Sequence, residues 1–262
     1  MIPELPPPPP PPEAAPSGPR DLPAVVWGFW QALAVFVAGD LLIGQLVVGS
    51  IVLSAMGVSA GEPIAGLPQI AASAGADAAF LVFMVGWLTW RSRDWVRRVG
   101  ILLGRRGIRD ALVGVGLGAI LYLVVTLLSI PLLSLFRQVF GGRVEPPEQI
   151  PEHLSANAKI LTAFLALVLA PVTEELFYRG ILFRGVRDRH GFALGVLVSA
   201  LLFGASHVVE APWQDTLYLQ TLMVFTGAGL ATIYERRGNL VADIAAHAAF
   251  NVIGIVIIFG GH

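Results

Sequence analysis

Two adjacent glutamates and an arginine interrupt an apolar stretch near the middle of the chain. Glu174 and Glu175 are followed by Arg179, within residues 161–184 that otherwise have the composition of a membrane-spanning helix. Each charge at membrane depth costs at least ~2.5 kcal/mol unless it is paired or lies in a wet cavity. Glu175 and Arg179 are four residues apart, so they share a helix face and can pair, whereas Glu174 is rotated by ~100°. Glu174 is therefore the freer carboxylate and a candidate general base. The alternative is that all three form one buried network that holds helices together.

A histidine ends a later apolar segment. Phe203 precedes His207 by one helical turn, and the residues between them are Gly204, Ala205 and Ser206. Such small residues let a neighbouring helix approach closely. A histidine in this position is either satisfied by its surroundings at a helix interface or available for chemistry.

The last apolar segment carries a stripe of polar residues. Asn239, Asp243, His247 and Asn251 follow one another at four-residue spacing, so they lie on one face of a helix. His247 and Asn251 are candidates for stabilising an oxyanion, which an asparagine side chain does strongly in a water-poor site. Asp243 could orient His247 from one turn below. The alternative is a ladder of hydrogen bonds that only packs the helix against its neighbours.

The composition places the chain in a membrane. It has 262 residues, of which 55% are hydrophobic and 13% charged, whereas soluble domains carry about 25% charged residues. Because there is no cysteine, disulfides, thiolate nucleophiles and cysteine-based metal sites are excluded. A net charge of −1 gives no reason to expect nucleic acid as a partner. The basic residues are all arginine except Lys159, which is typical of a GC-rich bacterial genome.

The hydropathy pattern predicts an all-α, polytopic membrane protein with about seven transmembrane helices around an intramembrane polar cavity. The expected helices are residues 24–50, 70–90, 110–136, 160–186, 192–212, 215–234 and 239–260. We divide the chain into a disordered, proline-rich cytoplasmic tail (1–23), N-terminal transmembrane helices (24–136) and a catalytic core of four helices (155–260). Asp40 and Asp77 are further acids in apolar segments, and we expect them to be helix-contact or cavity residues.

The charges of the loops predict the orientation. Loops at 91–109, 187–191 and 235–238 are rich in arginine, whereas residues 51–69 and 207–216 contain no lysine or arginine. Positively charged loops stay on the cytoplasmic side. The sequence therefore predicts a multi-pass protein of the cell membrane, such as a bacterial inner membrane, with its N-terminus in the cytoplasm. At ~1.5 Å per helical residue, Glu174, His207 and His247 all fall near mid-membrane, where they could share one cavity.

Three motifs in order resemble those of a known family. Glu174-Glu175 with Arg179, Phe203 with His207, and His247 with Asn251 resemble the EExxxR, FxxxH and HxxxN signatures of the CPBP intramembrane proteases. This family is also called Abi or the type II CAAX prenyl endopeptidase family. The resemblance covers about residues 155–260. It implies an intramembrane endopeptidase of helical fold that cleaves a membrane-associated peptide or protein.

The resemblance also implies roles for individual residues. Glu174 and His207 would activate a water molecule, and His247 and Asn251 would form the oxyanion hole. Glu175 and Arg179 would support them. Phe203, from the second motif, and Asp243, from its spacing to His247, are further candidate supporting residues. The preferred mechanism needs no cofactor, although Glu174, His207 and His247 could also form a zinc site with an open position.

Two questions stay open at this point. The family name is not evidence for a prenylated substrate, because prenylated CAAX proteins are not expected in a typical bacterium. The alternative function is a non-catalytic membrane protein, either an immunity or scaffold protein or a transporter that uses the same buried polar residues.

Overall fold

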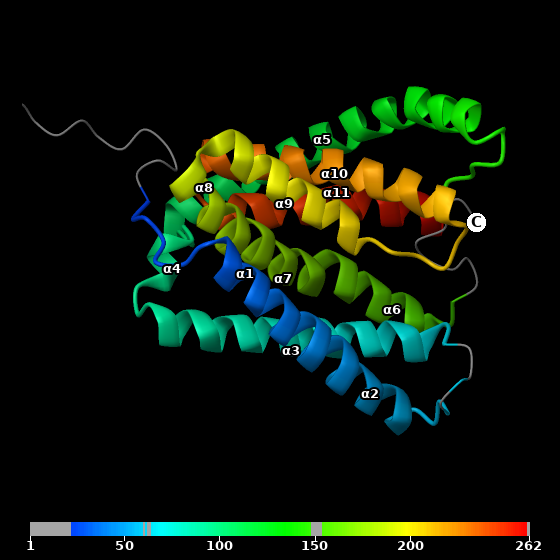
Figure 1. The fold of residues 1–262 in the computed structure, drawn as a ribbon, viewed down its shortest axis with the longest axis horizontal. Helices are drawn as coiled ribbons and strands as arrows, with labels where there is room; N and C mark the ends of the chain where they lie inside the picture. Colours follow the sequence, from blue (N-terminus) through cyan, green and yellow to red (C-terminus); the bar gives the residue numbers. More distant parts are fainter. Residues whose placement is uncertain (1–21, 60, 62–63, 148–153, 261–262) are drawn as a thin grey trace, which may run out of the picture.

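Long apolar helices run lengthwise through the molecule (Figure 1). The structure is a computed structural model that describes residues 22–59, 61, 64–147 and 154–260. Six stretches are long and apolar enough to cross a membrane: Phe29–Ala55, Leu67–Arg91, Gly104–Val139, Ala156–His190, Trp213–Arg237 and Leu240–Ile257. Phe192–Ser206 is a shorter apolar helix. The prediction of an all-helical, polytopic membrane protein is confirmed. The proline-rich tail lies outside the described residues up to position 21, so its disorder stays a prediction.

Several of these stretches are divided into consecutive helical segments. The first consists of α1 (Phe29–Val35), the π-helical η2 (Phe36–Gly49) and α2 (Ser50–Ala55), and it is followed by α3 (Leu67–Arg91), the short α4 (Trp95–Arg98) and α5 (Gly104–Val139). The fourth consists of α6 (Ala156–Phe164), π-helical η3 (Leu165–Leu169), α7 (Ala170–Glu175), π-helical η4 (Leu176–Phe183) and α8 (Arg184–His190). The chain ends with α9 (Phe192–Ser206), α10 (Trp213–Arg237) and α11 (Leu240–Gly260).

The expected fifth span, residues 192–212, is shorter than predicted. Helix α9 ends at Ser206, and an irregular segment leads to α10, which begins directly after Pro212. At ~1.5 Å per residue, a helix of 15 residues reaches only ~22 Å, which is less than the ~30 Å hydrocarbon core. Proline cannot continue a helix and disfavours helical backbone in the residue before it. The hydropathy pattern did not predict that the helix ends at Ser206, because Val208 and Val209 beyond it are also apolar.

Small residues allow the helices to approach one another closely. A methyl group added at Gly114 or Gly118 of α5 would collide with the backbone carbonyls of Ala242 and Ala246 of α11. Gly204 of α9 faces Val224 and the Gln220 carbonyl of α10 in the same way, as the sequence predicted for this residue. These contacts fix α11 against α5, and α9 against α10.

The arginine-rich loops gather at one end of the molecule, which we call the arginine-rich end (residues 91–104, 184–191 and 235–239). Arg187 pairs with Glu235, and the Leu240 amide donates to the Gly100 carbonyl. The extended segment 22–28 is held at the same end. Its backbone carbonyls accept hydrogen bonds from four arginines: Arg91, Arg98, Arg184 and Arg189.

Candidate active site

The polar residues singled out in the sequence meet at one cavity. Glu174, His207, His247 and Asn251 all line a cavity of about 1140 Å³ among the transmembrane helices. They come from α7, the C-terminal end of α9, and α11, so three separate parts of the chain supply them. The cavity walls also include residues 64–65 and 208–211, which belong to the two loops without lysine or arginine. The cavity therefore extends to the end opposite the arginine-rich end, which we call the arginine-poor end.

Glu174 keeps part of its side chain in the cavity. The side chain is 27% exposed, and its Oε2 atom has no hydrogen-bond partner. The Nε2 atom of His247 lies 4.0 Å from this oxygen. That separation is too long for a hydrogen bond, so the two side chains are not joined directly.

Glu175 faces away from the cavity into a fully buried network. Its Oε1 atom accepts a hydrogen bond from Arg179 at 2.9 Å and lies 2.7 Å from the Nδ1 atom of His247. Arg179 also donates to the Gly227 carbonyl and lies 3.8 Å from Asp243. The predicted Glu175–Arg179 pair is confirmed, and the pair also connects to the site through His247.

The sequence suggested that Asp243 orients His247, but the structure shows no contact between these two side chains. Asp243 lies 3.8 Å from Arg179 and interacts with Glu175, and it is Glu175 that contacts the histidine ring. The reason is that Glu175 reaches His247 from a neighbouring helix, and the four-residue spacing along α11 does not reveal such a contact.

The polar stripe of α11 is divided between two tasks. Asn239, at the start of the helix, accepts from the Leu102 and Val241 amides and donates to Asp110 at the arginine-rich end. Asn239 therefore joins α11 to α5, whereas His247 and Asn251 face the cavity. The alternative interpretation, that the polar stripe only packs the helix against its neighbours, therefore holds for Asn239.

Asn251 is placed by an irregularity in the helix that carries Glu174. In the π-helical segment η3 the Ala170 amide donates to Leu165, five residues earlier. In this register the donor for the Ala166 carbonyl would be residue 171, which is proline and has no N–H. The Asn251 side-chain amide donates to this carbonyl at 2.8 Å. An amide group carries two N–H donors, so one remains for the cavity.

Phe203 lies between the buried network and the histidines. Its ring centroid is 4.7 Å from that of His207 and 6.0 Å from that of His247, and the Arg179 guanidinium carbon lies 4.8 Å from the Phe203 centroid. The His207 Nδ1 atom lies 2.7 Å from the Phe203 carbonyl. Phe203 therefore supports His207 through its backbone and covers Arg179 with its ring.

Other residues of the site were not singled out as site residues from the sequence. Tyr178 donates to Ser206 at 2.8 Å, which ties the Glu174 helix to the end of α9 beside His207. Thr162 and Asp77 line the cavity, whereas Asp40 does not, and Asp40 accepts a hydrogen bond from Gln45. A polar residue within an apolar segment was the available signal for each of these, but it did not indicate their partners.

The geometry does not fit a zinc site formed by Glu174, His207 and His247. Across the described ranges, no group of three or more histidine, aspartate or glutamate side chains converges as metal ligands do. The Nδ1 atoms of His207 and His247 contact the Phe203 carbonyl and Glu175, so only the Nε2 atom of each ring could bind a metal ion.

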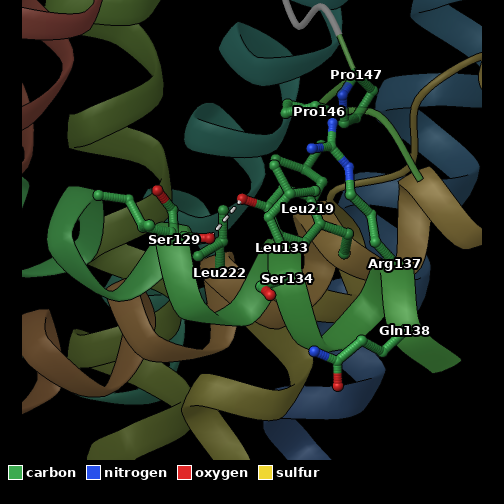
Figure 2. A pocket seen from close by; sticks show the side chains of 11 residues that line it. Ser129, Leu133, Ser134, Arg137, Gln138, Pro146, Pro147, Leu219 and Leu222 are labelled. Atoms are coloured by element: carbon green, nitrogen blue, oxygen red, sulfur yellow. Dashed lines mark hydrogen bonds between the residues drawn. The ribbon is translucent and has the colours of Figure 1, made fainter. Parts of the chain in front are cut away.

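A second pocket of about 690 Å³ adjoins the cavity between α5 and α10. It shares Ser129, Pro146, Pro147 and Leu222 with the cavity but contains none of the motif residues. Figure 2 shows the Arg137 side chain beside Pro146 and Pro147. Tyr218 donates a hydrogen bond to the Ser129 carbonyl. Arg137 therefore belongs to this neighbouring pocket.

Fold and site together define a polytopic helical membrane protein with a carboxylate–histidine cavity between its helices. Residues 156–253 match the Rce1-like type II CAAX prenyl endopeptidase family and form a domain of that family. The chain is also similar to an uncharacterized 24.3 kDa protein of Escherichia coli, with 31% identity over 146 residues. The similar region is 54% of this chain and 61% of that protein. No solved structure matches the chain.

Proposed function

We propose that this protein is an intramembrane endopeptidase that hydrolyses a peptide bond of a membrane-associated peptide or protein. The observation that carries the proposal is the convergence of Glu174, His207, His247 and Asn251 on one cavity among apolar helices. Membership of residues 156–253 in a family of CAAX prenyl endopeptidases supports the reaction class. The substrate need not be prenylated, because no feature of the cavity described above requires a prenyl group.

Glu174 and His207 are the groups that activate water in this proposal. A carbonyl can only accept a hydrogen bond, so the contact with Phe203 puts the His207 proton on Nδ1. In the neutral ring Nε2 is then an acceptor that can hold a water molecule. The water oxygen attacks the peptide carbonyl carbon while its proton passes to Glu174. Glu174 then delivers this proton to the leaving amine nitrogen as the C–N bond breaks.

His247 and Asn251 stabilise the oxyanion that forms on the carbonyl oxygen. The Glu175 carboxylate already accepts from Arg179, so its contact with His247 puts a proton on Nδ1 of that ring. His247 therefore donates from Nε2 only as an imidazolium. In that form the buried Glu175 carboxylate, 2.7 Å from Nδ1, is the counter-charge of the ring. The free N–H of Asn251 is the second donor.

The proposed reaction needs no metal ion. The lack of a converging ligand triad in the described residues supports this reading. Elemental analysis of the purified protein, together with cleavage in the presence of a chelator, tests it. Stoichiometric zinc and loss of cleavage with the chelator would contradict it.

The proposed location is the cell membrane, in a bacterium the inner membrane, with the N-terminus in the cytoplasm. The long apolar helices support a multi-pass protein, and the gathering of arginine-rich loops at one end supports the orientation. The lipid bilayer and a membrane-associated substrate are then its partners.

Substitution of the two water-activating residues tests the function. Glu174→Gln and His207→Ala should each reduce cleavage by at least about 100-fold, the lower range for losing a general base. The measurement is a comparison of membrane-derived peptides by mass spectrometry in cells that carry the wild type or a variant. Asp40→Asn is the matched control, because Asp40 is an acid in an apolar helix that does not line the cavity. Fragments that persist in both site variants would favour the non-catalytic alternative.

A further inference from the structure

Apart from His207 and His247, the ionisable residues that line the cavity are all acidic. Its acidic lining residues are Asp77, Glu145, Glu174, Glu210 and Asp215. Among the described residues that line it there is no lysine or arginine. Arg137, although close in the sequence to Glu145, lines the neighbouring pocket instead (Figure 2). A cavity lined in this way attracts cations and repels anions.

Asp77 is one of the four acids of this cavity that the proposed reaction does not use, and it is the one that lies near the middle of a transmembrane helix. It lies in the apolar helix α3 and interacts electrostatically with Glu174. Within the described part of the chain Asp77 has neither a hydrogen bond nor an ion pair. By contrast, Glu175 and Asp243 both face Arg179. Because an unpaired carboxylate at membrane depth is costly, such residues usually meet a functional partner.

Two buried residues in the cavity wall also have a polar atom without a hydrogen-bond partner. Thr162 is 7% exposed, lines the cavity, and its hydroxyl has no hydrogen-bond partner. His247 is 5% exposed, lines the cavity, and has its Nε2 atom beyond hydrogen-bond distance of Glu174. Buried polar groups are normally hydrogen-bonded, so these two point to a polar ligand in the cavity, independently of the acids.

We propose that the cavity selects a basic peptide, and that Asp77 pairs with a lysine or arginine side chain of that peptide. This rests on the proposed function, which makes the ligand a peptide. Glu145 and Glu210 are exposed at the arginine-poor end and guide the basic segment toward the cavity. Asp215 accepts a hydrogen bond from the Glu145 amide and thereby holds this part of the wall in place. Asp77 is thus the specificity-determining residue for the peptide's charge.

A binding experiment with matched peptides tests the proposal. Three fluorescent peptides of identical apolar sequence carry lysine, glutamine or glutamate at one position. The full chain is placed in phosphatidylcholine nanodiscs, because this neutral lipid does not itself attract the basic peptide. Binding is measured by fluorescence anisotropy in a His207→Ala background, where hydrolysis does not consume the probe. We expect the lysine peptide to bind about tenfold more tightly than the glutamine peptide, and the glutamate peptide to bind most weakly.

Two substitutions assign the preference to Asp77. In Asp77→Asn the lysine and glutamine peptides should bind equally, whereas Asp77→Glu should keep most of the preference. Asp94→Asn is the control, because it removes the same charge from an exposed residue at the arginine-rich end. Equal binding of the three peptides to the parent protein would overturn the proposal without any variant. A preference that survives in Asp77→Asn, or that is lost equally in Asp94→Asn, would overturn the role of Asp77.

The result is separable from the proposed function. Selective binding without cleavage of any peptide by the wild type would leave the basic-peptide site standing and remove the protease. Cleavage at equal rates for peptides of different charge would support the protease and overturn the basic-peptide site.

Discussion

Glu174 and Glu175 are adjacent in the sequence, but the structure gives them different surroundings. Glu175 is fully buried between Arg179 and His247, whereas the Glu174 side chain is partly exposed and lines the cavity. A buried carboxylate that loses its cation leaves an uncompensated charge in an apolar environment. Disturbing the surroundings of Glu175 should therefore lower stability, whereas replacing Glu174 should lower activity.

Replacing Arg179 by methionine tests this division. Arg179→Met leaves Glu175 and Asp243 without their shared cation, which should cost about 3–5 kcal/mol of folding free energy. We expect a clear drop in the melting temperature of the purified protein, followed by loss of activity. Glu174→Gln keeps the size of the side chain and breaks no hydrogen bond, so it should lose activity at an almost unchanged melting temperature. Equal melting temperatures for both variants would contradict the buried network.

At the scale of elements, the position of α11 relative to α5 determines where His247 and Asn251 lie. Gly114 and Gly118 repeat at the four-residue spacing that lets two membrane helices approach closely. A methyl group at Gly118 would collide with the carbonyl of Ala246, the residue directly before His247. The packing of these two helices is therefore coupled to the geometry of the site.

Substitution of Gly118 by alanine should weaken both packing and activity. Overpacking of this kind typically costs about 1–3 kcal/mol, and the displacement of α11 should move His247 away from Glu174. Gly116→Ala is the matched control on the same helix, because an added methyl group there meets nothing within 4 Å. The control should be neutral, or stabilised by up to about 1 kcal/mol through helix propensity. Melting temperature and cleavage rate measure both effects, and equal behaviour of the two variants would rule out the close contact.

The apolar segments and motif spacings were enough to predict an all-helical membrane protein and the identity of the cavity residues. Depth counting placed Glu174, His207 and His247 at one level, but it could not determine their directions around the bundle. The partners of Asp243 and Asn251 could not be predicted, because Arg179 and Ala166 lie on helical segments that are distant in the sequence. Pro171 was visible, but its effect depends on the π-helical register before it, which hydropathy does not encode.

At the scale of the whole molecule, the two ends of the bundle differ in charge and in construction. The arginine-rich end holds segment 22–28 through arginine side chains, whereas the cavity extends to the arginine-poor end. If positively charged loops face the cytoplasm, the cavity opens toward the outside of the cell. A basic peptide would then enter from the external side.

Cysteine labelling can test this orientation, because the chain has no cysteine of its own. Ser59 and Arg93 are exposed residues, in the loops after α2 and after α3 respectively, and those loops lie at opposite ends of the bundle (Figure 1). In intact cells, Ser59→Cys should react with a membrane-impermeant maleimide, whereas Arg93→Cys should react only after the membrane is permeabilised. Each variant serves as the control for the other, since both carry a single thiol in an exposed loop. The reverse labelling pattern would place the arginine-rich end outside, and the cavity and its substrate would then have to face the cytoplasm.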